Sequence, residues 1–241
     1  MGNELIAALP EYHPDRDAGI DYGLTAVNAF IPIVGSGLAD LARGIIARKA
    51  EERQHEFDTL IAVEVTRLAG LVEGITPQSM VESDEFMAAY AKVARVAAET
   101  ESTKKRQRLA VTLTQMGPWS TVDPTRRRDL MDLTAVYDDL HVFLLGYFRD
   151  PAAWLRANAP AWRPGKYMMA GIDTVLADYV FTDGTEWRPS VTAAVSRFSM
   201  DGVADVPMNV SMSDAGNVQK RTTAFGDQFL SFIEGSADTP R

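Results

Sequence analysis

The sequence predicts a mainly α-helical protein in which an antiparallel bundle of long helices is followed by a small α+β module. Three observations predict this fold. Apolar residues recur at spacings of three and four over most of residues 38–148. Pairs such as Gly117-Pro118 and Asp150-Pro151 mark places where helices end. After Gly165 the pattern changes to shorter apolar segments that are separated by polar turns.

The composition is that of an ordinary globular protein. The 241 residues are 46% hydrophobic and 24% charged, which is enough to build a core and argues against a long disordered chain. Cysteine is absent, which excludes disulfides and thiolate metal sites and fits a reducing compartment. The first residues show no basic stretch followed by an apolar run, so no signal peptide is predicted and a cytoplasmic location is expected.

The charge balance disfavours polyanionic partners. The chain has 24 basic and 33 acidic residues and a formal net charge of −9. Nucleic acids and anionic membranes repel such a chain unless its basic residues are concentrated in one place.

The first 19 residues, with Pro10, Pro14 and Gly19, predict an irregular N-terminal arm. The most apolar stretch follows at residues 24–39. It has about 16 residues, whereas spanning a bilayer takes roughly 20. The favoured interpretation is a buried, kinked helical segment. The alternative is a membrane-active segment within residues 24–46, whose inserting side chains would be Phe30, Ile31, Ile33 and Val34.

Three helices are predicted in the bundle domain, which covers residues 20–165. The first follows an apolar spacing through residues 38–72 and could reach about 50 Å. The second starts after Ser83, a suitable N-cap, and stops at Gly117-Pro118. The third starts at Asp123-Pro124, with proline in the first helical position. The short connections favour an antiparallel arrangement.

The C-terminal module, residues 166–241, is predicted to mix helices with two short strands. The expected helices cover residues 168–180, 187–200 and 225–233, and the expected strands cover residues 203–206 and 220–223, with a turn at 213–217 between them. Gly202 stands where a glycine C-cap would end the middle helix.

Two pieces of this module resemble bacterial winged-helix domains. They are Val195-x-x-Phe198-x-x-x-Gly202-Val203 and Thr222-Thr223-x-Phe225-Gly226-x-x-Phe229-Leu230. The resemblance implies that the first piece joins a recognition helix to a strand and that the second joins the wing to a closing helix. It also makes Lys220 and Arg221 candidate wing contacts to DNA. From Lys166 onward, however, the chain has six basic and ten acidic residues. This balance favours a protein-protein or packing role over DNA binding.

The whole chain is similar to uncharacterised bacterial and phage-borne helical proteins. The opening piece of this likeness is Ile31-Pro32-Ile33-Val34-Gly35, which precedes long charged helices and a winged-helix-like end. A distant likeness to abortive-infection-type proteins is at the level of architecture, and it implies a bacterial or phage origin and a role in defence. It carries no catalytic residues.

No catalytic set, cofactor site or metal site is predicted. The three histidines, His13, His55 and His141, lie in different segments, and none forms an HExxH motif. Phosphate-binding and nucleophile-elbow motifs are also missing from the sequence.

Two basic clusters remain as candidate binding residues. They are Lys104, Lys105, Arg106 and Arg108 in one cluster and Arg126, Arg127 and Arg128 in the other. The favoured interpretation is a salt-bridged surface. The alternative is a patch for an acidic protein, a phosphate or a lipid headgroup.

These observations lead to one main hypothesis, a non-enzymatic protein-interaction or regulatory protein that binds a protein partner or self-associates. A membrane-active effector and a winged-helix DNA-binding regulator are the alternatives.

Overall fold

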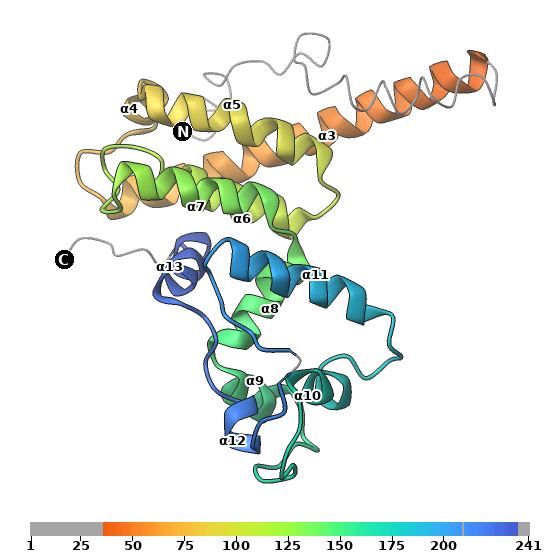
Figure 1. The fold of residues 1–241 in the computed structure, drawn as a ribbon. Helices are drawn as coiled ribbons and strands as arrows, with labels where there is room; N and C mark the ends of the chain where they lie inside the picture. Colours follow the sequence, from red (N-terminus) through yellow and green to blue (C-terminus); the bar gives the residue numbers. More distant parts are fainter. Residues whose placement is uncertain (1–35, 209, 236–241) are drawn as a thin grey trace. The chain divides into compact units, whose positions relative to one another are not determined.

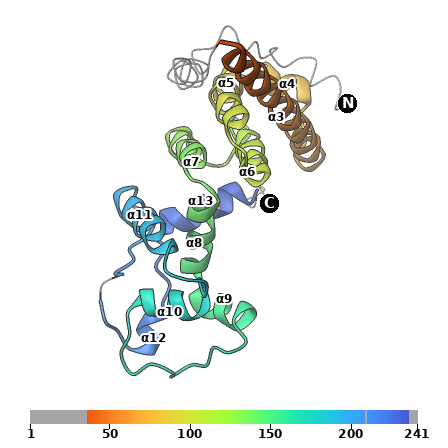
Figure 2. The same cartoon turned by 90° about the vertical axis from the view of Figure 1, so that its right-hand side faces the viewer.

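The structure is a computed structural model that describes residues 36–208 and 210–235, with side chains from residue 44 onward. The chain forms two compact units. The first comprises the chain up to Val136 together with Ile233 onward, and the second runs from Tyr137 to Phe232. Both are built from helices (Figures 1 and 2). The expected domain boundary near Gly165 lies inside the second unit.

The first unit is organised around α3, Ser36–Leu71, a helix of 36 residues. At 1.5 Å per residue it is about 54 Å long. Among its side chains from residue 44 onward, the buried face starts at Gln54 and continues through Phe57, Ile61 and Val65. These spacings place one stripe against α5 and α6, and the extent of α3 confirms the long helix that the sequence predicts.

A polar contact sets the position of α5 on α3. Tyr90 of α5 accepts a hydrogen bond from Gln54 at 3.2 Å and donates one to Asp58 at 3.0 Å. Gln54 also donates to Asp58 at 2.9 Å. Burial raises the pKa of the Asp58 carboxyl, and its hydrogen bonds oppose that rise without cancelling it.

The second predicted helix is two helices, α5 at Asp84–Glu99 and α6 at Thr103–Leu113, preceded by the short α4 at Pro77–Val81. Thr100 has an extended backbone, with a ψ angle of 138°. The Ser102 hydroxyl accepts a hydrogen bond from the Lys105 N–H at 3.0 Å. A C-cap and a new N-cap therefore interrupt the helix, although the apolar spacing of the sequence continues across the break. Because of this break, α6 packs against both α3 and α5.

The third predicted helix is also interrupted, giving α7 at Pro124–Val136, α8 at Asp139–Arg149 and α9 at Pro151–Asn158. The carboxylate of Asp138 accepts the N–H of His141 at 3.0 Å and caps α8. α7 belongs to the first unit, whereas α8 and α9 belong to the second.

The second unit continues with α10 at Ile172–Tyr179, α11 at Trp187–Met200, α12 at Asp214–Asn217 and α13 at Ala224–Ile233. Its centre is aromatic. The ring of Tyr137 lies 5.7 Å from that of Phe198 and 5.4 Å from that of Phe229. The Tyr137 hydroxyl donates to Asp201 at 2.9 Å, so this buried phenol is satisfied.

The expected α+β winged-helix character is wrong for the part of the chain that the structure describes, which contains no strand. The segments expected as strands meet only at an isolated bridge between Ala204 and Thr222. A ladder would need the N–H groups of Arg221 and Val203, but these donate to Phe148 and Phe198 at 2.8 and 3.0 Å. The expected wing turn is the short helix α12.

Gly226 allows α13 to pack directly on the chain that follows α11. A Cβ at this position would lie 2.0 Å from the carbonyl oxygen of Val203. Gly226→Ala should therefore lower the free energy of unfolding by about 2 kcal/mol or more, because the backbone must move to admit the methyl group. Thermal unfolding followed by circular dichroism measures the loss.

Gly70→Ala is the matched control, since Gly70 is an exposed glycine of α3 whose added Cβ would meet nothing within 4 Å. It should raise stability by about 0.5–1 kcal/mol through the lower helix propensity of glycine. Equal melting temperatures for the two variants would contradict the close packing at Gly226.

Candidate functional site

A cleft with a volume of about 600 Å³ opens in the first unit, between α5 and α7. This volume lies within the range of about 300–1,000 Å³ that is usual for ligand sites. It is lined by one face of each helix and by a residue that follows α6: Asp84, Glu85, Ala88, Ala89, Lys92, Met116, Pro124, Arg128, Met131 and Asp132. We call it the α5–α7 cleft.

The floor of the α5–α7 cleft is apolar. Met116 and Met131 are each 2% exposed, and the methyl group of Ala89 is buried beside them. Ala88 also lines the cleft but is exposed. Two neighbouring alanines leave room that larger side chains would fill. Methionine side chains adapt to ligands of different shapes, so this floor suits apolar side chains of a partner.

Two ion pairs join α5 to α7 along the cleft. Glu85 pairs with Arg127 at 2.7 Å, and Lys92 pairs with Asp132. Glu85 and Lys92 are seven residues apart on α5, which corresponds to about 10 Å along the helix axis. The apolar floor between them is therefore about two helical turns long.

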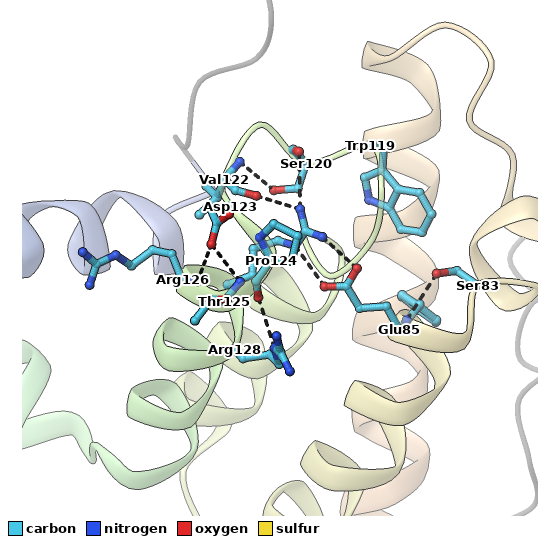
Figure 3. Close-up of polar contacts among 12 residues, drawn as sticks. Ser83, Glu85, Trp119, Ser120, Val122, Asp123, Pro124, Thr125, Arg126 and Arg128 are labelled. Atoms are coloured by element: carbon cyan, nitrogen blue, oxygen red, sulfur yellow. Dashed lines mark hydrogen bonds and ion pairs between the residues drawn. The ribbon is translucent and has the colours of Figure 1, made fainter.

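Arg127 is the buried member of these pairs, with its side chain 4% exposed. Its Nε and Nη2 donate to the two carboxylate oxygens of Glu85 at 3.0 and 2.7 Å. Its Nη1 donates to the Val122 carbonyl at 2.7 Å. Figure 3 labels the two residues that receive these bonds, Glu85 and Val122. A bidentate pair of this kind fixes both distance and orientation. Arg127 therefore holds the first turn of α7 against the first turn of α5.

The start of α7 is built locally. Asp123 Oδ1 accepts the N–H of Thr125 at 2.9 Å and that of Arg126 at 3.3 Å (Figure 3). Pro124 occupies the first position of the helix, as predicted. The preceding loop is held by Trp119, whose Nε1 donates to the Thr114 carbonyl at 2.8 Å.

The rim of the cleft offers one cation and one anion. Arg128 is exposed, and the only polar contact of its side chain within residues 44–208 and 210–235 is a 3.3 Å bond from Nε to the Pro124 carbonyl. Asp84 is exposed on the first turn of α5 and has no ion pair among the same residues. These two groups face solvent on opposite helices and are available to a partner.

The three arginines of the second basic cluster therefore do not form one surface. Arg126 and Arg128 are exposed, whereas Arg127 points inward and is used by Glu85. Consecutive residues of a helix lie about 100° apart, so three adjacent arginines do not share a face. Arg127 is not part of a surface patch.

The first basic cluster also contains one buried arginine among more exposed basic residues. Arg106 is 4% exposed, and its Nη2 donates to Glu56 at 2.6 Å while Nη1 donates to the Thr100 carbonyl at 2.8 Å. Lys104 is exposed, and Lys105 and Arg108 are half-buried. Arg106 therefore secures α6 to α3. A patch for an anion stays a prediction for the remaining basic residues.

The two candidate wing residues have contacts inside the second unit. Lys220 pairs with Asp227, and Arg221 donates to the Gly216 carbonyl at 2.6 Å. The predicted DNA contact depended on a wing, which the described part of the chain lacks.

The candidate membrane-active side chains, Phe30, Ile31, Ile33 and Val34, lie outside the described residues. Among the helices that the structure describes, none combines the length and the apolar character needed to cross a bilayer.

The best acid-base candidate outside the cleft is His141 with Asp138. Nδ1 of His141 lies 2.6 Å from Asp138 Oδ1, and its ring stacks on Tyr137 at 4.9 Å. Burial alone would raise the pKa of the Asp138 carboxyl, but hydrogen bonds from His141 outweigh burial and lower it. Asp138 also caps α8, so the pair has a structural role. In the described residues, histidines and acids form no group of three that could hold a metal ion.

The cleft residues Glu85, Ala88 and Met131 are absent from the sequence-based candidates. Their only signal in the sequence is a position on amphipathic helices, which is shared by many residues. The pairing of α5 with α7, which follows from tertiary packing, is what brings them together.

No family model matches the chain, and its comparison with curated proteins and with solved structures also gave no match. The resemblance to bacterial and phage-borne proteins therefore stays a hypothesis.

Adjacent arginines should differ sharply in their effect on stability. Arg127→Ala should lower the free energy of unfolding by about 2–4 kcal/mol, because it leaves Glu85 and the Val122 carbonyl without their partner. Arg128→Ala, one residue away, should change it by less than about 0.5 kcal/mol. Urea denaturation followed by tryptophan fluorescence and circular dichroism compares them. Equal losses would contradict the role of Arg127 in joining the helices.

Proposed function

We propose that this protein is a non-enzymatic interaction protein that binds an apolar segment of a protein partner in the α5–α7 cleft. The observation that carries the proposal is the apolar floor of Ala88, Ala89, Met116 and Met131 between two ion pairs that join α5 to α7. A site with this lining binds apolar side chains by burying them.

The dimensions of the cleft fit a short segment, either about two turns of helix or an extended stretch of about five residues. Its floor is about 10 Å long, close to the distance between residues i and i+7 of a helix. A helix that lies in such a groove inserts side chains from positions i, i+3 or i+4, and i+7. The volume of about 600 Å³ accommodates a few such side chains, whereas the backbone of the partner stays outside.

The rim charges give the partner an orientation. Arg128 on α7 favours an acidic group, and Asp84 on α5 favours a basic one. The apolar floor takes uncharged anchors, and charged flanks on a partner segment would add contacts to this rim. Such rim contacts contribute more to specificity and association rate than to affinity.

A regulatory role in a bacterial or phage context, including defence, is the biological setting that we propose for this binding. It is supported by the opening piece Ile31-Pro32-Ile33-Val34-Gly35 and the long charged helices that follow, whereas the winged-helix-like end no longer supports it.

Selection from a displayed library of random 12-residue peptides tests the cleft directly. Peptides enriched on the full chain should be rich in leucine, isoleucine and phenylalanine. Their affinity should fall at least about tenfold for Ala88→Trp, because the indole fills the cleft. Fluorescence anisotropy with labelled peptides measures the affinities.

Ala91→Trp is the matched control, since Ala91 is also exposed on α5 but does not line the cleft. Both variants add the same side chain to the same helix, so their melting temperatures should agree. Peptides that bind wild type, Ala88→Trp and Ala91→Trp equally well would refute the proposal, as would a selection that yields no binders.

A further inference from the structure

The N-terminal half of α3 extends beyond the helices that cover its C-terminal half. Its face is buried from Gln54 onward, but Ile45 and Ile46 are 39% and 47% exposed. Ile46 precedes Phe57 by eleven residues, which is close to three helical turns, so both lie on one stripe. Figure 1 shows this half of α3 running past the end of α5. Ile45 and Ile46 are therefore left partly uncovered by the described helices.

The chain immediately before α3 has the chemistry that the α5–α7 cleft requires. Residues 24–35 contain no charged side chain and include Phe30, Ile31, Ile33 and Val34. The floor of the cleft is apolar, and burying uncharged apolar side chains there leaves no charge unpaired.

Residues 30–34 cannot reach the cleft of their own copy. Tyr90 contacts Gln54 and Asp58, so the neighbouring cleft residue Ala88 lies near the level of Asp58 on α3. Asp58 is 22 residues after Ser36, or about 33 Å along a helix. An extended chain covers at most about 3.5 Å per residue, so Phe30, six residues before Ser36, reaches only about 21 Å.

We propose that residues 30–34 of one copy occupy the α5–α7 cleft of a second copy. This inference rests on the proposed function, because it names the apolar segment that the cleft binds. The segment and the cleft are different surfaces, so the contact is head-to-tail. Each copy then offers a free segment and a free cleft, and copies add in a ring or a filament.

Two complementary variants of the full chain test this arrangement. Ala88→Trp blocks the cleft and keeps the segment, whereas a double variant with Ile31→Asp and Ile33→Asp keeps the cleft and disables the segment. In sedimentation velocity at about 100 µM, wild type should associate with increasing concentration, and each variant alone should be a monomer.

An equimolar mixture of the two variants should form a one-to-one heterodimer that grows no further. It contains one intact segment and one intact cleft, and these belong to different chains. Ala91→Trp should associate as wild type does. A monomeric wild type, association that survives Ala88→Trp, or a mixture that stays monomeric would each overturn the inference.

A synthetic peptide of residues 24–35 separates this inference from the proposed function. It should bind the double variant and lose at least about tenfold in affinity for Ala88→Trp. If library-selected peptides bind in a cleft-dependent way but this peptide does not, the inference fails and the proposed function stands. If neither kind of peptide binds, both fail.

Discussion

The buried guanidinium of Arg127 is the contact on which the candidate site depends. A buried charge is tolerated only when its hydrogen-bonding groups are satisfied, and Arg127 achieves this with Glu85 from α5 and the Val122 carbonyl from the preceding loop. The planar guanidinium admits one orientation of the two helices. The walls of the cleft are therefore fixed before any ligand enters, which reduces the entropy lost on binding.

The length of α3 contributes in a different way. A helix is a stiff spacer, whereas a flexible linker of equal residue number would let its ends approach each other. Because residues 36–53 form a helix rather than a loop, Ser36 lies about 33 Å along α3 from the level of Asp58, which is farther than the roughly 21 Å that an extended chain from Ser36 back to Phe30 can cover. In the proposed head-to-tail contact, the stiffness of α3 is what would exclude contact within one copy.

Helix starts were easier to predict than helix breaks. The caps at Ser83 and Asp123 were predicted because each polar side chain precedes an apolar pattern. The breaks before Thr103 and Asp139 were missed, because the apolar stripe continues across both and hides the caps. The prediction of two short strands was wrong because the N–H groups of Arg221 and Val203 donate to the carbonyls of Phe148 and Phe198. Neither N–H group is therefore available to pair the two segments into a ladder.

The sequence alone determined the helical character, the helix starts after Ser83 and at Pro124, the absence of disulfides and the presence of an uncharged apolar segment. These properties depend on local spacing and composition. Only the tertiary structure decided what Arg126, Arg127 and Arg128 do, and which alanines and methionines form a cleft. The three adjacent arginines differ in burial because consecutive helix residues point about 100° apart. The packing of α7 on α5 then determines that Arg127 is the buried one.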